Sequence, residues 1–243
     1  TIDLSALTVG AVFDLNPGKI SSIGKVQGSV DAVENLAIGV DSIIENIIGT
    51  DLKDIITLNS ASNQVNGGAG IDFVIYNDSF SLHSLSKSGS SFVFNGGPND
   101  FDTLTNVERV VFADKKLALD LDGNAGLVAK LLGTVFGKDA VQVPEYIGLG
   151  LGLVDGGMSY SELMQLALIE RLGAGFSNEA LVDLLFKNLV GSPPSASDSA
   201  TYVGAIEAGQ FTQVSLAVEA SNHEISTMNI NLVGLAETGL FWA

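Results

Sequence analysis

The stretch that decides the fold is Gly67-Gly68-Ala69-Gly70-Ile71-Asp72-Phe73-Val74-Ile75, in which three glycines precede an acidic residue and a short β-branched run. Steps of nine residues back from the eighth place of this stretch meet only apolar β-branched residues: Val74, Val65, Ile56, Ile47 and Ile38. Two places before the first four of these stand oxygen-bearing side chains: Asp72, Asn63, Asp54 and Glu45. A nine-residue period of this kind is typical of stacked β-helical coils, so the sequence predicts a short parallel β-roll.

The glycine-rich stretch also matches the calcium-binding nonapeptide G-G-x-G-x-D-x-U-x. Two such units make one coil, so turns on the same side recur every 18 residues, which is the spacing of Asp54 and Asp72. Calcium takes carboxylate and carbonyl oxygens. We therefore expect one Ca²⁺ between the turns 49–54 and 67–72, with ligands from Thr50, Asp51, Leu52, Asp54, Gly68, Gly70 and Asp72. The alternative is an ordinary Gly/Asp turn at the end of a hairpin.

The chain changes character near residue 124. Residues 1–124 contain short β-branched runs separated by polar turns, which predict strands. Residues 125–243 place apolar side chains at helical spacing, with one stripe from Leu127 to Phe136 and another from Leu181 to Val190. The expected fold is α+β: an RTX-like calcium-binding β domain with additional strands over 1–124, followed by a helical domain over 125–243.

The helical part repeats itself. Its two apolar stripes end at Gly137 and Gly191, and each is followed by a loop with a tyrosine and then by a second helix, over 159–172 and 212–223. The segment Ser159-Tyr160-Ser161-Glu162 fits a capping box. The spacing predicts an internal duplication over about 125–175 and 178–230, followed by an apolar C-terminal tail.

Composition excludes several classes of protein. The chain has 243 residues, with 11 Lys and Arg against 28 Asp and Glu, and its formal net charge is −17. Nucleic-acid binding is not expected, because a polyanion requires clustered basic residues. No window has the run of about 18 apolar residues of a spanning helix, so no integral membrane segment is expected. The absence of cysteine removes disulfides and suits a secreted bacterial protein.

Three segments carry a resemblance to a known family. Residues 13–24, residues 44–49 and the nonapeptides resemble the C-terminal RTX region of serralysin-type secreted proteins, and residues 102–114 resemble the segment that often closes such regions. The helical half resembles a domain of uncharacterised function found in exported bacterial surface and S-layer-like proteins. The resemblance implies calcium-triggered folding outside the cell, export by a type I secretion apparatus and a structural or adhesive role at the bacterial cell surface. Thr50 and Leu52 depart from the family pattern, because they replace glycines.

Catalytic motifs are not found. The zinc motif H-E-x-x-H requires two histidines one helical turn apart, whereas the only histidines are His83 and His223. No G-x-S-x-G nucleophile elbow occurs. We interpret Asp100 and Asp102 as solvent or ion contacts in a turn, and Asp120 to Asn124 as a cap of the first helix. The chain is not expected to be an enzyme.

Two segments suggest assembly. Residues 79–83 and 91–94 predict a hairpin with a weakly protected edge, and residues 228–233 alternate as a strand would. These segments and the tail 238–243 either pack on their own domain or contact another subunit. The expected function is that of a non-enzymatic extracellular structural protein, a self-assembling surface-layer or filament subunit or an adhesive module. The alternative is the C-terminal export and folding region of a larger secreted hydrolase.

Overall fold

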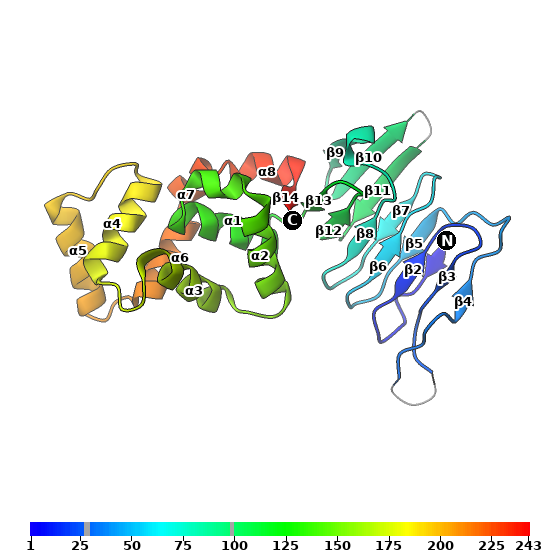
Figure 1. Cartoon of the computed structure of the whole chain (residues 1–243), viewed down its shortest axis with the longest axis horizontal. Helices are drawn as coiled ribbons and strands as arrows, with labels where there is room; N and C mark the ends of the chain where they lie inside the picture. Colours follow the sequence, from blue (N-terminus) through cyan, green and yellow to red (C-terminus); the bar gives the residue numbers. More distant parts are fainter. Residues whose placement is uncertain (27–29, 98–99) are drawn as a thin grey trace. The chain divides into compact units, whose positions relative to one another are not determined.

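A computed structural model describes residues 1–26, 30–97 and 100–243 of the chain. These residues form two compact units. The first, here called the β unit, comprises residues 1–120 and 237–239, and the second, the helical unit, comprises residues 121–236 and 240–243. Strands dominate the first unit and helices the second, so the fold is α+β (Figure 1). The division at Asp120 and Leu121 lies close to the boundary expected at residue 124.

The β unit contains two main sheets. One has the order β1-β5-β7-β11-β10-β9, with bounds Ile2–Asp3, Asn46–Ile48, Gln64–Asn66, Asp100–Thr105, Ser91–Gly97 and Ser84–Ser88. The other contains the order β13-β12-β8-β6-β2, with bounds Lys116–Ala118, Arg109–Val111, Phe73–Ile75, Ile55–Thr57 and Val12–Asp14. A short antiparallel pair, β3 (Ile20–Ser21) and β4 (Leu36–Ala37), forms a third sheet and is joined to β2 by hydrogen bonds between Ser22 and Val12.

The glycine-rich region supplies strands to the two sheets in turn. Strands β5 and β7 pair in parallel in one sheet, and β6 and β8 do so in the other. The central residues face each other across these pairs, Ile47 opposite Val65 and Ile56 opposite Val74, and none is more than 2% exposed. All four belong to one hydrophobic core, which confirms that the apolar places of the nine-residue pattern are buried.

The parallel ladders continue after a long interruption. Strand β11 pairs in parallel with β7, placing Leu104 opposite Val65, and β12 pairs in parallel with β8, placing Val110 opposite Val74. The segment between β8 and β11 holds the hairpin of β9 and β10, so it separates neighbouring strands by more than twenty residues of sequence. Leu104 lies 39 residues after Val65, outside the nine-residue register, whereas Val110 lies 36 residues after Val74, a multiple of nine.

The predicted hairpin forms, but one of its strands is displaced. Residues 79–83 were expected to be extended, whereas Phe80–Leu82 form a 3₁₀ turn and the strand is β9, Ser84–Ser88. Gly89, with φ +62°, makes the turn to β10. The strand at the sheet edge therefore contains Lys87, whose ammonium group lies 5.2 Å from the ring centroid of Phe92. The expectation of an edge without lysine is wrong.

The helical unit contains two successive sets of three helices. The first set is α1 (Asn124–Val135), α2 (Pro144–Asp155) and α3 (Tyr160–Leu172), with a 3₁₀ segment at Lys138–Gln142. The second set is α4 (Asn178–Leu189), α5 (Ala196–Glu207) and α6 (Gln213–Asn222). The chain continues through α7 (Glu224–Asn229) and α8 (Leu232–Thr238) to β14 (Leu240–Trp242). Each set lines an open, mainly apolar pocket, of about 390 Å³ in the first and about 380 Å³ in the second.

Two expectations for this unit are wrong. The segments around Tyr146 and Tyr202 are helices α2 and α5 rather than loops, because Pro144 begins one and Ser195 caps the other. Residues 228–233 belong to the end of α7 and the start of α8, not to a strand. The segment from Asp120 to Asn124 contains the N-cap of α1, which is Gly123, without a side-chain hydrogen bond to the helix. The capping box at Ser159 and Glu162 is confirmed.

No helix formed by the described residues is both long enough and apolar enough to span a membrane.

Candidate functional site

Two glycine turns lie directly on each other in the β unit. Residues 49–54 connect β5 to β6, and residues 67–72 connect β7 to β8. A Cβ atom on Gly68 would overlap the carbonyl oxygen of Thr50, and one on Gly70 would lie 2.8 Å from the carbonyl carbon of Leu52. Both glycines have positive φ, +105° and +119°. Glycine is required at these places because the turns touch through their backbones and the conformation is left-handed.

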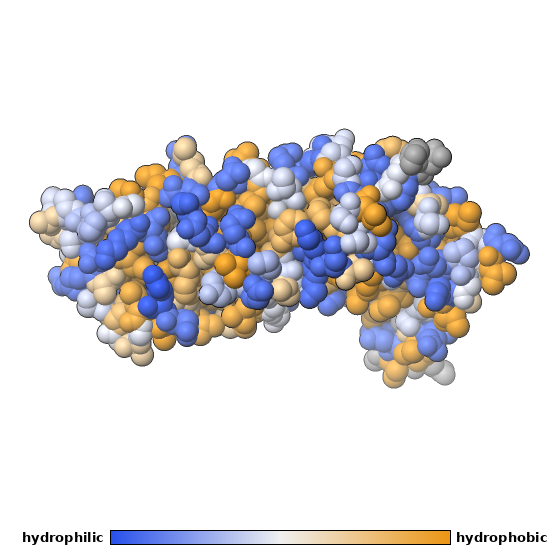
Figure 2. All heavy atoms as spheres, turned by 45° about the horizontal axis from the view of Figure 1, so that its top comes forward, coloured by the Kyte–Doolittle hydropathy of each residue, from blue (hydrophilic) through white to orange (hydrophobic). Residues whose placement is uncertain are grey.

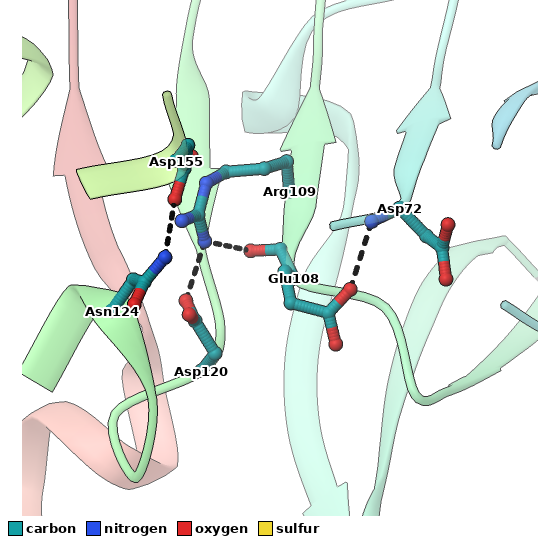
Figure 3. Close-up of polar contacts among 6 residues, drawn as sticks. All are labelled: Asp72, Glu108, Arg109, Asp120, Asn124 and Asp155. Atoms are coloured by element: carbon teal, nitrogen blue, oxygen red, sulfur yellow. Dashed lines mark hydrogen bonds and ion pairs between the residues drawn. The ribbon is translucent and has the colours of Figure 1, made fainter. Parts of the chain in front are cut away.

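Carboxylates join the stacked turns by a ladder of hydrogen bonds. The backbone N–H of Ala11 donates to Asp54 Oδ1 over 2.6 Å, and the N–H of Asp54 donates to Asp72 Oδ1 over 2.8 Å. The N–H of Asp72 donates in turn to Glu108 Oε2 over 2.8 Å (Figure 3). Each acidic side chain thus accepts a backbone hydrogen bond from the preceding turn. Asp54 and Asp72 lie on one side of the unit, as the 18-residue spacing predicts.

Asp54 is fully satisfied by the protein. Besides the bond from Ala11, it accepts the Thr50 N–H at Oδ2 over 2.5 Å and the Thr50 hydroxyl at Oδ1 over 3.1 Å. Both residues have no exposed surface. Threonine replaces a motif glycine here, and its hydroxyl supplies a donor that glycine lacks. The first turn is therefore closed by its own hydrogen bonds.

Asp72 differs from Asp54 at one oxygen. Its Oδ1 accepts the Asp54 N–H, but its Oδ2 has no hydrogen-bond partner among the described residues, although the side chain has no exposed surface. Burial raises the pKa of Asp72 from 3.8 to about 8, the Asp54 N–H opposes this rise, and the charges of Glu108 and Asp54 add to it. A buried oxygen of this kind is completed by a proton or by a cation.

The other expected ligand residues are divided between the stack and the solvent. The carbonyl of Thr50 accepts the Ala69 N–H over 3.3 Å, so it lies between the two turns. The carbonyl oxygen of Leu52 lies 3.1 Å from Thr50 Oγ1, as Asp54 Oδ1 does, and the one hydroxyl proton is shared between these two acceptors. The Leu52 side chain is 47% exposed. Asp51 is exposed as well. The stack thus brings together Thr50, Asp54, Gly68, Gly70 and Asp72, and it leaves the side chains of Asp51 and Leu52 outside.

Two buried carboxylates that accept backbone hydrogen bonds were not expected. Glu108 continues the series of Asp54 and Asp72, and burial raises its pKa. On the opposite side of the unit, Asp102 Oδ1 accepts the N–H of Asn63 over 2.8 Å. Glu108 lies 36 residues after Asp72, a multiple of nine, but the hairpin occupies the steps between them, and Asp102 lies 39 residues after Asn63, outside the nine-residue register. The available signal was the segment 102–114, which resembles the closing segment of RTX regions.

A buried ion pair follows the last acid of the ladder. The Arg109 guanidinium is completely buried, and it donates to the Asp120 carboxylate and, over 2.9 Å, to the carbonyl oxygen of Glu108 (Figure 3). Its positive charge opposes the rise in the pKa of Glu108. An arginine in this position ties the turn that carries Glu108 to the end of the β unit, so Glu108 is held in place for Asp72.

The stacked turns contain some, but not all, of the oxygen ligands expected for calcium. Among the described residues no group of three His, Asp or Glu side chains is placed to bind a metal ion. The expected site requires two carboxylates and backbone carbonyls instead. Asp72 Oδ2 is buried and open to a cation, and the Thr50 and Leu52 carbonyls each retain a lone pair. Both oxygens of Asp54 already accept hydrogen bonds, Oδ1 from the Ala11 N–H and Oδ2 from the Thr50 N–H.

Comparison with protein-family models finds no match to this chain, and no curated protein matches it.

Proposed function

We propose that the chain is a non-enzymatic, calcium-stabilised structural protein of the extracellular bacterial surface, with an RTX-like β-roll in its β unit. The observation that carries the proposal is Oδ2 of Asp72, which is buried beside Gly67 of its own turn and has no hydrogen-bond partner among the described residues. The alternation of β5 to β8 between two sheets supports the roll, because each nonapeptide of a roll contributes one strand to alternate faces.

Calcium would act by removing an electrostatic cost. A buried ionised carboxylate is expensive, and Glu108 and Asp54 make the Asp72 charge more so. A divalent cation beside Asp72 Oδ2 favours the ionised form and leaves the backbone ladder intact. Since such a site does not exist in an unfolded chain, the free energy of binding becomes free energy of folding. The net charge of −17 keeps the unfolded chain extended where free calcium is low.

The proposed assembly uses the edge of a sheet rather than an apolar patch. Figure 2 shows hydrophobic and hydrophilic residues intermixed over the visible face of both units, without one dominant apolar area. Strand β9 ends its sheet, and most of its side chains are exposed. An edge strand of this kind can pair with a strand of another chain. Lys87 is the one charged residue of β9 that would hinder such pairing. We propose self-association through this edge and export by a type I apparatus.

The test is a calcium titration of the full chain starting from chelator, followed by circular dichroism, light scattering and negative-stain imaging. Calcium should raise the thermal midpoint, and Asp72→Asn should abolish the rise because the open oxygen is lost. Asp51→Asn is the matched control, since it removes an exposed carboxylate from the adjoining turn without touching the stack.

Two outcomes would contradict the proposal. If calcium raised the thermal midpoint of Asp72→Asn and of the parent chain equally, the calcium site would not lie at Asp72 in the stacked turns. A calcium-bound chain that stays monomeric in scattering and imaging would leave a stabilised module without the assembly role.

A further inference from the structure

A polar cavity lies in the β unit, apart from the stacked glycine turns. Its volume is about 260 Å³, and the segment joining β8 to β9 forms one wall. Its titratable lining residues are Tyr76, Asp78, His83, Asp100 and Asp102. Gly96 leaves room beside it, because a Cβ there would lie 2.6 Å from Asp100 Oδ2 and 2.9 Å from His83 Cε1. No role in the calcium ladder explains this cavity.

Two polar atoms of the lining, His83 Nδ1 and Asp100 Oδ1, are buried without a partner among the described residues. The Tyr76 hydroxyl is directed toward the Asp102 carboxylate. Tyr76 is 6% exposed and the His83 side chain 2% exposed, so water reaches neither freely. Unpaired buried polar atoms cost stability, and native proteins keep them chiefly where another group completes them. Two such atoms from separate places in the chain at one cavity indicate a bound ligand.

The charge of the cavity is negative. The carboxylates of Asp78, Asp100 and Asp102 all lie near the Tyr76 hydroxyl, and burial together with these charges raises the pKa of Tyr76. The hydroxyl therefore keeps its proton. His83 Nε2 lies 3.0 Å from Asp78 Oδ1. An N–H at Nε2 that donates to this carboxylate leaves Nδ1 of a neutral imidazole as an acceptor.

The cavity thus combines acceptors with negative charge. Asp100 Oδ1 is an acceptor, His83 Nδ1 is one in the tautomer that carries its proton on Nε2, and the Asp102 carboxylate lies behind the Tyr76 hydroxyl. A ligand that completes them carries positive charge and several N–H donors. A directly coordinated metal ion fits less well, since no three His, Asp or Glu side chains of the described residues are placed around one point. A primary ammonium group has three donors in a compact form, and it also suits aromatic walls.

We propose that this cavity binds a primary alkylammonium group. The volume suits a chain of about the length of a lysine side chain, with the ammonium at Asp100 and His83 and the carbon chain toward Leu58. The ligand can be a free amine or the lysine side chain of another polypeptide. Both present the same chemistry to the cavity, and two probes separate them.

The experiment uses the histidine ring protons of the full chain as reporters. The chain has two histidines, so the C2 protons of His83 and His223 give two proton NMR signals, which His223→Gln assigns. The probes are 1,4-diaminobutane and Nα-acetyl-lysine methylamide, and the uncharged control is Nα-acetyl-norleucine methylamide. A saturable shift of the His83 signal with an unmoved His223 signal is the expected result. Saturation by the diamine alone assigns a free amine, and saturation by the lysine derivative assigns a polypeptide side chain.

Variants test the assigned contacts. Asp100→Asn should weaken binding about tenfold or more, because it removes a charge-assisted hydrogen bond. Asp41→Asn removes an exposed negative charge elsewhere in the β unit and should leave affinity within about twofold. If Asp100→Asn does not fold, Tyr76→Phe replaces it, since it removes only the hydroxyl and should also weaken binding.

Four results would overturn the proposal. They are no saturable His83 shift with either amine, an equal shift with the norleucine derivative, unchanged affinity in the pocket variant, and a saturable His83 shift caused by Ca²⁺ alone in the Asp72→Asn chain, which lacks the proposed calcium site. The last would assign the cavity to a metal ion. None of them depends on calcium binding at Asp72.

Discussion

Asp54 and Asp72 occupy equivalent places 18 residues apart, yet the two carboxylates differ at Oδ2. The backbone N–H of Thr50 donates to Asp54 Oδ2, whereas Asp72 Oδ2 has no hydrogen-bond partner among the described residues. Gly68, at the place that matches Thr50, also has a backbone N–H, and the threonine hydroxyl lies at Oδ1 of Asp54 instead. The direction of one backbone N–H, and not the threonine side chain, therefore decides which acid can receive a cation.

The pH dependence of stability tests the state of Asp72. Its pKa rises from 3.8 to about 8 on folding, so between these values the folded chain holds a proton that the unfolded chain has lost. In chelator, the free energy of unfolding should fall as pH rises from about 4 to about 8, by at most roughly 1.4 kcal/mol per pH unit from this group. Urea unfolding at several pH values measures it. Asp72→Asn should have a smaller slope, and an unchanged slope would show that Asp72 titrates normally.

The glycine stack makes a second prediction at this scale. Gly68→Ala should lower the free energy of unfolding by more than Gly89→Ala. Both residues have positive φ, so both pay the left-handed penalty of roughly 1–2 kcal/mol, but only Gly68 meets a backbone oxygen. A Cβ on Gly89 has nothing within 4 Å. Urea unfolding compares the two variants, and equal losses would mean that the turns can separate without cost.

At the scale of elements, the sequence predicted features that depend on neighbouring residues better than it predicted which distant strands pair. The capping box of α3 was visible because Ser159 and Glu162 act within one turn. Strand β11 was not located as the neighbour of β7, because the hairpin inserted between them removes the spacing that sequence counting relies on. The alternating pattern of residues 228–233 predicted a strand, but these residues belong to helices α7 and α8. Six residues of alternation are too short a pattern to distinguish a strand from a helix.

The N-cap of α5 gives a prediction for an element that the sequence had left as a loop. Ser195 and Asp198 form a reciprocal capping box, with Ser195 Oγ accepting the Asp198 N–H over 3.1 Å. Ser195→Ala should lower the free energy of unfolding by about 1 kcal/mol. Ser197→Ala, an exposed neighbour inside the helix, should cost nothing. Denaturant unfolding followed at 222 nm measures both, and equal effects would show that the cap contributes nothing.

For the whole molecule, the two units predict separate responses to calcium. The proposed site lies within the β unit, and the helical unit has its own core and caps. Calcium should slow amide hydrogen exchange in residues 46–75 by a large factor and leave residues 124–222 unchanged. Exchange measured by mass spectrometry with and without chelator reports both. Equal protection in the two units would show that they fold as one, contrary to this prediction.

The sequence by itself determined what depends on local or strictly periodic information. The nine-residue pattern placed Ile47, Ile56, Val65 and Val74 in the core, and the glycines marked the turns that stack. Helical periodicity located α1, α3, α4 and α6. These features follow from side-chain period and backbone conformation, which act over a few residues.

Only the tertiary structure decided which groups meet across long stretches of chain. Glu108 joins Asp72 over 36 residues, and Asp102 joins Asn63 over 39 residues. The polar cavity collects Tyr76, His83 and Asp100 from segments before and after the hairpin. The satisfaction of buried polar atoms is a property of the folded arrangement, because each hydrogen bond needs a donor and an acceptor brought together by packing. For that reason the open oxygen of Asp72 is visible in the structure and not in the motif.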